Sequence, residues 1–468
     1  MIMHRRQFLQ LTGGGAVAAL CPSVAADIGS IKRLAIRAQS GRVHIVGPDF
    51  PATAIWGYDG QVPGTSIRLV HGQALEASVH NDLDVPTSVH WHGIRLPNAM
   101  DGVAGVTQPA IAPGDSFDYR FTPPDAGTFW YHSHINAHEQ VGRGLYGPLV
   151  IEEKEPPVVD RDLVLMIDDW RLLDDASIKE DFESGHDRSH AGRIGNAPTV
   201  NGRFRDVLEV RYGERLRLRL INASNARNFA LDFAPLKPDV IAIDGQPITP
   251  YRPDDAIVIA AGGRVDLIVD IFADPGSMLE VSDSFYRRPF SLIKFAVGDE
   301  PLRQSPLETA IALNPAQLPE PDLSNAKSYE VVLDGGAMGG LERAMMDGKW
   351  MNLFDIARQG YAWALNDIVG NRLDMPPLID VPLGTHISLT IDNRTAFPHP
   401  MHLHGHHIKL LSIDDHPVPQ PHWVDSPLVM PRQKLQFAFV ADNPGKWLFH
   451  CHILEHHAAG MGSIVRVS

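Results

Sequence analysis

Four His-x-His pairs, two in the first third of the chain and two near its end, constrain the fold more than any other feature. They are His90-Trp91-His92, His132-Ser133-His134, His402-Leu403-His404 and His450-Cys451-His452. Because side chains alternate between the two faces of a strand, each pair places two imidazoles on one face. The chain has 23 histidines in 468 residues, for which composition alone predicts about one such pair. The pairs therefore indicate a shared metal cluster, which requires the two ends of the chain to pack together.

Cys451 stands between the histidines of the last pair, so one strand offers ligands to two sites. In a strand its side chain faces away from the flanking imidazoles. His456 and Met461 follow in the next loop, and His399 precedes the third pair. Two histidines, a cysteine and a long axial methionine form a blue copper electron-transfer centre. We therefore expect such a centre beside the histidine cluster.

Five other histidines are not expected to bind metal. His406, His407 and His457 adjoin the motifs and are expected to support the ligands or to contact solvent. His186 and His190 lie in a charged loop with no metal-ligand pattern.

The motifs His-Trp-His-Gly, His-Ser-His, His-Pro-x-His-Leu-His-Gly and His-Cys-His-x3-His-x3-Gly-Met resemble the four signatures of three-domain multicopper oxidases. The resemblance covers nearly the whole mature chain and implies four copper ions. It implies a type 1 copper at His399, Cys451, His456 and Met461, a type 2 copper at His90 and His402, and a type 3 pair at His92, His132 and His452 and at His134, His404 and His450.

Composition and patterning predict an all-β protein. Runs rich in Val, Ile and Phe, such as 118–122, 163–167 and 265–269, alternate with turns, and the chain has 40 Gly and 37 Pro. This pattern is typical of β-sandwiches, and the length suggests about three domains. The family resemblance implies three cupredoxin-like Greek-key β-sandwich domains.

We predict five segments along the chain. They are a signal peptide (1–26), a first domain with copper ligands (27–155), a second domain without copper that acts as a spacer (156–297), a proline-rich linker (298–327) and a third domain with the type 1 and remaining cluster ligands (328–468).

The N-terminus resembles a twin-arginine export signal. Arg5-Arg6 precedes an apolar run at 11–20 and the small-residue site Ser23-Val24-Ala25. We therefore expect passage through the twin-arginine export machinery to the periplasm. The run is too short to span a membrane, so no membrane association of the mature form is expected. Removal of Cys21 with the signal would leave Cys451 as the sole cysteine, which suits metal ligation.

The net charge of the chain limits the classes of partner that it is expected to bind. The formal charge of −15 at pH 7 disfavours nucleic acids and anionic membranes as partners.

The resemblance implies an oxidase that takes single electrons at the type 1 copper, passes them through Cys451 to the cluster, and reduces dioxygen to water. Asp101 matches an acidic residue of the family and is our candidate proton relay; the alternative, an Asp-Gly turn residue, stays open. In copper-efflux oxidases a glutamate of a second proton path stands where this chain has His457, which puts that path in doubt.

Substrate residues differ from those of copper-efflux oxidases. Thr395 and Phe397 stand where those enzymes carry Asp and Met. A long Met-rich insert is also missing; the methionines of the matching region, Met338, Met345, Met346 and Met351, are expected on the core face of an amphipathic helix.

These differences favour a laccase-like oxidase of phenols and aromatic amines. A cuprous or other metal-ion oxidase of copper tolerance and a non-catalytic copper-sequestering protein are the alternatives. Asp425 is expected to orient a type 1 histidine.

Overall fold

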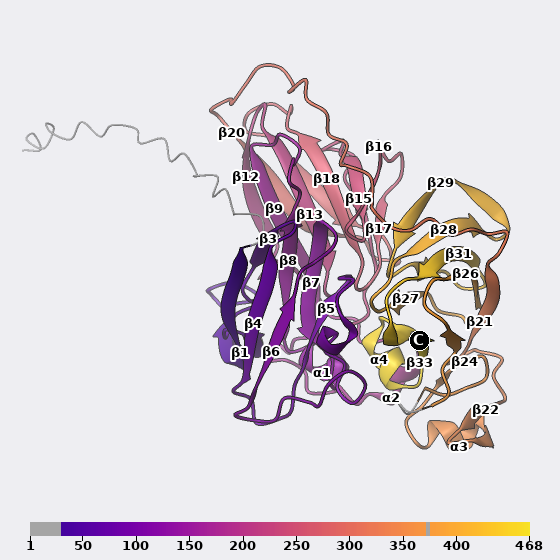
Figure 1. Cartoon of the computed structure of the whole chain (residues 1–468). Coiled ribbons are helices and arrows are strands. Elements are labelled where there is room, and N and C mark those ends of the chain that lie inside the picture. The colour runs from indigo at the N-terminus through magenta and orange to yellow at the C-terminus, as the bar shows by residue number, and fades with distance from the viewer. Residues whose placement is uncertain (1–29, 371–374) are drawn as a thin grey trace, which may run out of the picture.

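A computed structural model describes residues 30–370 and 375–468. The predicted signal peptide and Cys21 lie outside these residues. Three pairs of β-sheets follow one another along the chain, and short helices occupy some of the connections (Figure 1). The predicted all-β class and three-sandwich architecture are confirmed.

The first sandwich pairs two four-stranded sheets, ordered β2-β1-β4-β6 and β3-β8-β7-β5. Their strands are β1 (Ile31–Val43), β2 (Thr53–Tyr58), β3 (Ile67–Val70), β4 (Ala74–Asn81), β5 (Val89–His92), β6 (Ser116–Phe121), β7 (Gly127–Ser133) and β8 (Tyr146–Glu152), with η1 (Asn98–Met100) and α1 (Ala137–Gln140) in the connections. In β4, buried and partly exposed residues alternate, as expected of a strand with one face on the core.

The second sandwich pairs a seven-stranded sheet, β11-β10-β9-β13-β18-β15-β16, with a five-stranded sheet, β12-β20-β19-β14-β17. Its elements are β9 (Arg161–Trp170), α2 (Gly185–Ser189), β10 (Ala197–Val200), β11 (Arg203–Phe204), β12 (Asp206–Arg211), β13 (Arg215–Asn222), β14 (Phe229–Asp232), β15 (Asp239–Ile243), β16 (Gln246–Tyr251), β17 (Ile257–Ile259), β18 (Arg264–Asp270), β19 (Met278–Asp283) and β20 (Phe290–Gly298).

The central strand β13 is buried along its whole length although three of its residues are arginines. Arg217 bonds both Glu153 and Asp266, and Arg219 Nη1 donates to Thr128 Oγ1 of the first sandwich at 2.9 Å. A buried guanidinium requires carboxylate or hydrogen-bond partners. Ion pairs therefore lie at the contact between the first and second sandwiches.

The third sandwich pairs a six-stranded sheet, β24-β21-β26-β31-β28-β29, with a five-stranded sheet, β25-β33-β32-β27-β30, and carries the hairpin β22-β23. Its elements are β21 (Lys327–Gly335), β22 (Arg343–Met346), β23 (Lys349–Asn352), α3 (Leu353–Ala357), β24 (Trp363–Leu365), β25 (Ile379–Val381), β26 (Thr385–Asn393), β27 (His399–Leu403), β28 (Ile408–Ile413), β29 (His416–Val424), β30 (Leu428–Val429), β31 (Lys434–Ala441), β32 (Gly445–Cys451), α4 (Leu454–Ala458) and β33 (Gly462–Val467).

The three strands predicted by position are present as parts of β6, β9 and β18, although β6 ends at Phe121, one residue before the predicted end. The predicted methionine-lined helix is wrong, because Met345, Met346 and Met351 lie in the β22-β23 hairpin. Its turn, Asp347-Gly348, has positive φ at both residues, 51° and 72°. Asp-Gly in this conformation joins two antiparallel strands. The turn therefore determines a hairpin here, although the spacing of the methionines is also compatible with a helix.

The first and third sandwiches lie side by side, with β5 and β7 facing β27 and α4 (Figure 1). Arg95 Nη1 bonds Asp442 Oδ2 at 3.1 Å across this contact, and Asn98 Nδ2 donates to the Lys446 carbonyl at 2.7 Å. The packing predicted from the histidine pairs is therefore confirmed. No helix within the described residues is long and apolar enough to cross a membrane.

Candidate metal centre

All eight histidines of the four pairs lie buried at the contact between the first and third sandwiches. Strand pairing explains their meeting: His90 on β5 is opposite His132 on β7, and His402 on β27 is opposite His450 on β32. The other member of each pair follows two residues later on the same face. Groups whose ligand atoms all lie within 4.8 Å of one another include His90, His92 and His132; His90, His402 and His404; and His134, His404 and His450.

Backbone carbonyls fix the orientation of several of these rings. The Nδ1 atoms of His90, His132, His402 and His450 lie 2.8–3.0 Å from the carbonyl oxygens of Asp101, Ser133, Asp425 and Cys451. An Nδ1–H that donates to a carbonyl leaves Nε2 with a free lone pair, as metal-ligating histidines require.

The inward nitrogens fit metal ions better than they fit one another. His404 Nε2 lies 3.1 Å from His450 Nε2, and His402 Nε2 lies 3.4 Å from His90 Nε2. Burial, and then neighbouring imidazoles, hold the pKa of His404 and His450 well below the usual value. Facing lone pairs on neutral rings repel unless a cation lies between them. His132 Nε2 and both ring nitrogens of His452 also find no hydrogen-bond partner among the described residues.

A second group lies on the opposite face of β32. Cys451 Sγ lies 3.5 Å from His399 Nδ1 and 3.8 Å from His456 Nδ1, and the two nitrogens are 3.1 Å apart. Met461 is fully buried, and its carbonyl accepts a hydrogen bond from Cys451 N at 3.0 Å. Burial raises the pKa of the Cys451 thiol, so the thiolate requires a nearby cation. This donor set fits copper.

Comparison with known proteins agrees with this geometry. Multicopper oxidase family profiles match residues 41–156, 161–278 and 346–468. Multicopper oxidase MmcO of Mycobacterium tuberculosis is 30% identical over 91% of this chain and 85% of its own length. The chain belongs to the multicopper oxidases.

Two further relatives are similar over most of their length. Copper resistance protein A of Pseudomonas syringae pv. tomato is 28% identical, with 91% of each chain covered. The crystal structure of a multi-copper oxidase from Pseudomonas thermotolerans is 30% identical, with a TM-score of 0.82 over 94% of this chain and 100% of the other. Membership implies that this oxidase holds copper ions.

Asp101 contacts two cluster histidines of the oxidase. Its Oδ2 lies 2.9 Å from His404 Nδ1, and its Oδ1 lies 3.2 Å from His90 Nδ1. It is also followed by a tight turn, because Gly102 has φ +81° and a Cβ there would lie 1.7 Å from the Val89 carbonyl oxygen. Asp101 can therefore be both a turn residue and the candidate proton relay, because the turn holds its carboxylate against the cluster.

Asp425 does not contact the group of His399, Cys451 and His456, the predicted type 1 group, so its predicted role there is wrong. Its Oδ1 lies 3.2 Å from His92 Nε2 and 3.4 Å from His402 Nδ1, both in the cluster. Burial opposes its ionisation, but the Arg264 guanidinium, whose Nη1 donates to Oδ1 at 2.7 Å, holds the pKa of Asp425 well below its usual value. Backbone pairing decides this placement, since Leu403 N donates to the Asp425 carbonyl at 3.1 Å.

Two other groups contact the type 1 histidines. Thr395 Oγ1 lies 2.8 Å from His399 Nε2, and His456 Nε2 donates to the His190 carbonyl at 2.6 Å. Every residue has a backbone carbonyl, so the contact between His456 and the His190 carbonyl could not be predicted from the residue types in the sequence. Thr395 could have been found from its position four residues before His399.

The second sandwich therefore contributes to the metal centre, although it was expected to act only as a spacer. The segment that includes α2 and extends to residue 196, named here the 185–196 segment, covers the type 1 group. The Arg188 carbonyl accepts from Trp363 Nε1 at 2.6 Å, and Arg193 N donates to Glu455 Oε2 at 3.0 Å. Glu455 directly precedes His456, so the second sandwich fixes the loop that carries a predicted type 1 ligand.

The remaining histidines are distributed as follows. His406 and His407 are buried, and His407 Nε2 lies 3.4 Å from Asp425 Oδ2. The His457 ring lies 4.3 Å from that of His450, and burial lowers the pKa of His457 to about 4. All three thus lie beside the cluster, with His406 and His407 buried and His457 partly exposed. His186 and His190 stack at 4.0 Å and belong to no potential metal group of the described residues.

Proposed function

We propose that the oxidase couples the one-electron oxidation of phenols and aromatic amines to the four-electron reduction of dioxygen to water. The position of Cys451 carries this proposal. Its Sγ belongs to the type 1 group, while the adjacent residues His450 and His452 belong to the cluster. Electrons accepted at one group thus reach the other through a few covalent bonds.

The proposed copper ligands follow the family signatures. They are His399, Cys451, His456 and Met461 for type 1; His90 and His402 for type 2; and His92, His132, His452 and His134, His404, His450 for the type 3 pair. When bound, the four copper ions would supply electron storage and oxygen binding. Asp101, held between His90 and His404, is our candidate for moving protons to the cluster.

The surroundings of the type 1 group favour an organic donor. The edge of His399 is closed by Thr395, which is fully buried, and Phe397 is 9% exposed. Neither side chain offers the carboxylate or thioether that would hold a cuprous ion. We infer that electrons arrive instead at the edge of His456, through the His190 carbonyl. The imidazole of His190 is partly exposed there and stacks on that of His186, whose side chain is 72% exposed.

Oxygen consumption by the copper-reconstituted protein tests the proposal. Uptake is measured with a phenolic donor and separately with Cu(I), while the absorbance of the Cys451 thiolate-copper band is recorded. A blue protein that oxidises the phenol faster than Cu(I) is the expected result. A preference for Cu(I) would reject the laccase-like substrate class.

A metal-ion oxidase of copper tolerance is the second candidate. It is favoured by the relative named copper resistance protein A and by Met338, which is 75% exposed. A copper-sequestering protein is the candidate of another class. That protein would bind copper but take up no oxygen with either donor, so the same experiment separates all three.

We also propose export to the periplasm by the twin-arginine machinery. The Arg5-Arg6 pair ahead of an apolar run supports this. Replacing both arginines with lysine should retain the protein in the cytoplasm on cell fractionation. Unchanged periplasmic recovery of that variant would contradict the proposal.

A further inference from the structure

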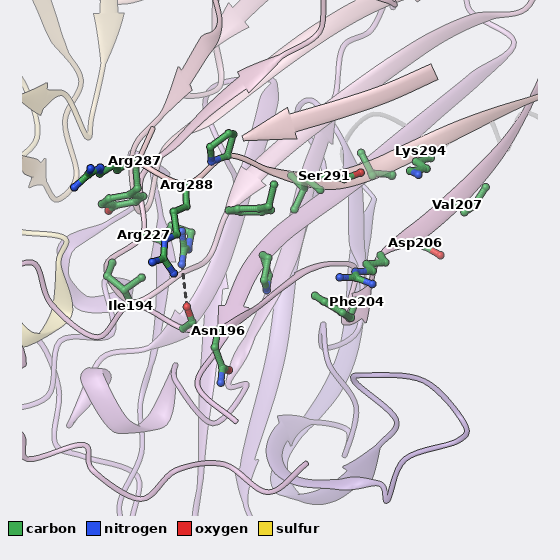
Figure 2. A pocket seen from close by; sticks show the side chains of 18 residues that line it. Ile194, Asn196, Phe204, Asp206, Val207, Arg227, Arg287, Arg288, Ser291 and Lys294 are labelled. Atoms are coloured by element: carbon green, nitrogen blue, oxygen red, sulfur yellow. Dashed lines mark hydrogen bonds between the residues drawn. The ribbon is translucent and has the colours of Figure 1, made fainter. Parts of the chain in front are cut away.

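The second sandwich contains a cavity of about 1250 Å³, which is larger than most small-molecule sites. Its walls are residues 194–196, 204–207 and 286–294, together with Pro198 and Arg227. Figure 2 shows Arg227, Arg287 and Arg288 gathered at one end, with Asp206, Val207 and Lys294 at the other. We name it the arginine pocket. No predicted copper ligand lines it.

The charge of the arginine pocket is opposite to that of the molecule. The chain has 56 acidic and 41 basic residues, yet the walls carry five cationic side chains and one carboxylate. That carboxylate, Asp206, has Arg203 outside the walls as its partner at 3.9 Å, and Lys294 has Glu280 at 3.3 Å. Within the described part of the chain, Arg205, Arg287 and Arg288 have no carboxylate within 4.0 Å. The pocket therefore presents unneutralised guanidinium groups.

Arg227 is the buried member of this set, with 8% of its surface exposed. Its Nε donates to Asp169 Oδ2 at 2.9 Å, and its Nη2 donates to the Gly195 carbonyl at 2.9 Å. Nη1 makes no hydrogen bond to any described residue. A fixed guanidinium with one free nitrogen, next to two unpaired arginines, is suited to a planar anion that accepts two hydrogen bonds.

Aromatic rings surround the same guanidinium. The Arg227 Cζ lies 5.3 Å from the ring centre of Tyr286 and 5.4 Å from that of Phe290. Both rings are partly exposed and line the pocket, as does Phe204, over which Arg205 lies at 4.9 Å. These surfaces favour a ligand with a flat apolar body, since rings stack on one another and on guanidinium planes.

We propose that the arginine pocket binds an aromatic carboxylate. The carboxylate pairs with Arg287, Arg288 and the free Nη1 of Arg227, and the ring lies against Tyr286 and Phe290. The site goes beyond the proposed oxidase reaction, which needs no ligand in the second sandwich, so either proposal can fail without the other.

Calorimetric titration of the copper-loaded protein with benzoate tests this site. Benzoate is not oxidised by a phenol oxidase, so binding is measured without turnover. Benzoate should bind at least about tenfold tighter than neutral benzamide, because only the carboxylate makes charge-assisted bonds. Equal binding of the two would overturn the proposal. Inorganic phosphate should bind more weakly than benzoate; equal affinity would indicate a bare anion site and overturn the aromatic part.

The double variant R287Q/R288Q locates the binding. Both side chains are exposed, so the fold should be unaffected, and an unchanged circular dichroism spectrum checks this. Benzoate affinity should fall about tenfold or more. The matched control is R358Q, an exposed arginine that lies over Phe354 in the third sandwich and should leave affinity unchanged. Unchanged affinity in the double variant, or an equal loss in the control, would reject the pocket as the site.

Discussion

Asp101 is the single residue on which oxygen chemistry is expected to depend most. Asp101→Asn retains the size of the side chain and the turn at Gly102 but removes the ionisable oxygen. Oxygen uptake should fall by about 10² or more, the usual contribution of a proton-transfer group. Anaerobic reduction of the type 1 band, followed by stopped-flow absorbance, should keep its rate because His399 and Cys451 are untouched.

Asp118→Asn is the matched control for this variant. Asp118 lies exposed on β6 of the same sandwich, so its substitution should leave both rates unchanged. Oxygen uptake by Asp101→Asn within twofold of the parent would assign the carboxylate to the turn alone.

Asp168 on β9 makes stability depend on pH. Burial, and then the carboxylate of Asp169, raises the pKa of Asp168 from 3.8 to about 7. The folded protein thus keeps a proton that the unfolded chain releases at lower pH, so the free energy of unfolding falls as the pH rises from about 4 to about 7. Asp168→Asn cannot ionise, and its Tm should fall less than that of the parent between pH 5 and pH 8. Scanning calorimetry measures this; Asp254→Asn, an exposed residue, should keep the parental slope, and a parental slope in Asp168→Asn would contradict the assignment.

Among the secondary-structure connections, the 185–196 segment links the second sandwich to His456 of the proposed type 1 group. Gly192 has φ +81°, and a Cβ there would lie 2.4 Å from Ala226 Cβ and 2.6 Å from Ile453 Cγ2. Gly192→Ala should therefore displace the segment and with it the His190 carbonyl. We expect a shifted type 1 absorption band and slower type 1 reduction by a phenol.

Gly276→Ala separates displacement from backbone strain. Gly276 has a similar φ, +80°, but a Cβ there would meet nothing within 4 Å. Both variants should lose about 1–2 kcal/mol of stability to the left-handed conformation, and Gly192→Ala should lose more because its Cβ meets Ala226 and Ile453. Only Gly192→Ala should alter the type 1 band, and identical spectra of the two variants would show that the segment does not orient His456.

At the scale of the whole molecule, copper ions bound at the cluster should stabilise the contact between the first and third sandwiches. The cluster histidines come from the first and third sandwiches, whereas His399, Cys451 and His456 all come from the third. Ions that bind only the assembled interface stabilise it by roughly 4 kcal/mol when present at a thousand times their dissociation constant. Chelation should therefore lower the Tm and split the calorimetric transition. His90→Ala should split it likewise, whereas Cys451→Ser should lower the Tm of a single transition; the reverse pattern would contradict a bridging role.

The sequence alone determined the all-β class, the histidine pairs that the cluster brings together and the need for the chain ends to meet. These features rest on local rules: alternation along a strand fixes which imidazoles share a face, and turn residues mark where strands end. Only the tertiary structure decided that Asp425 contacts His92 and that the His190 carbonyl accepts from His456. The same holds for the arginine pocket, which β10, β12 and β20 enclose together. Such contacts join residues that lie far apart in the sequence, or use backbone atoms that every residue carries, so packing rather than residue type selects them.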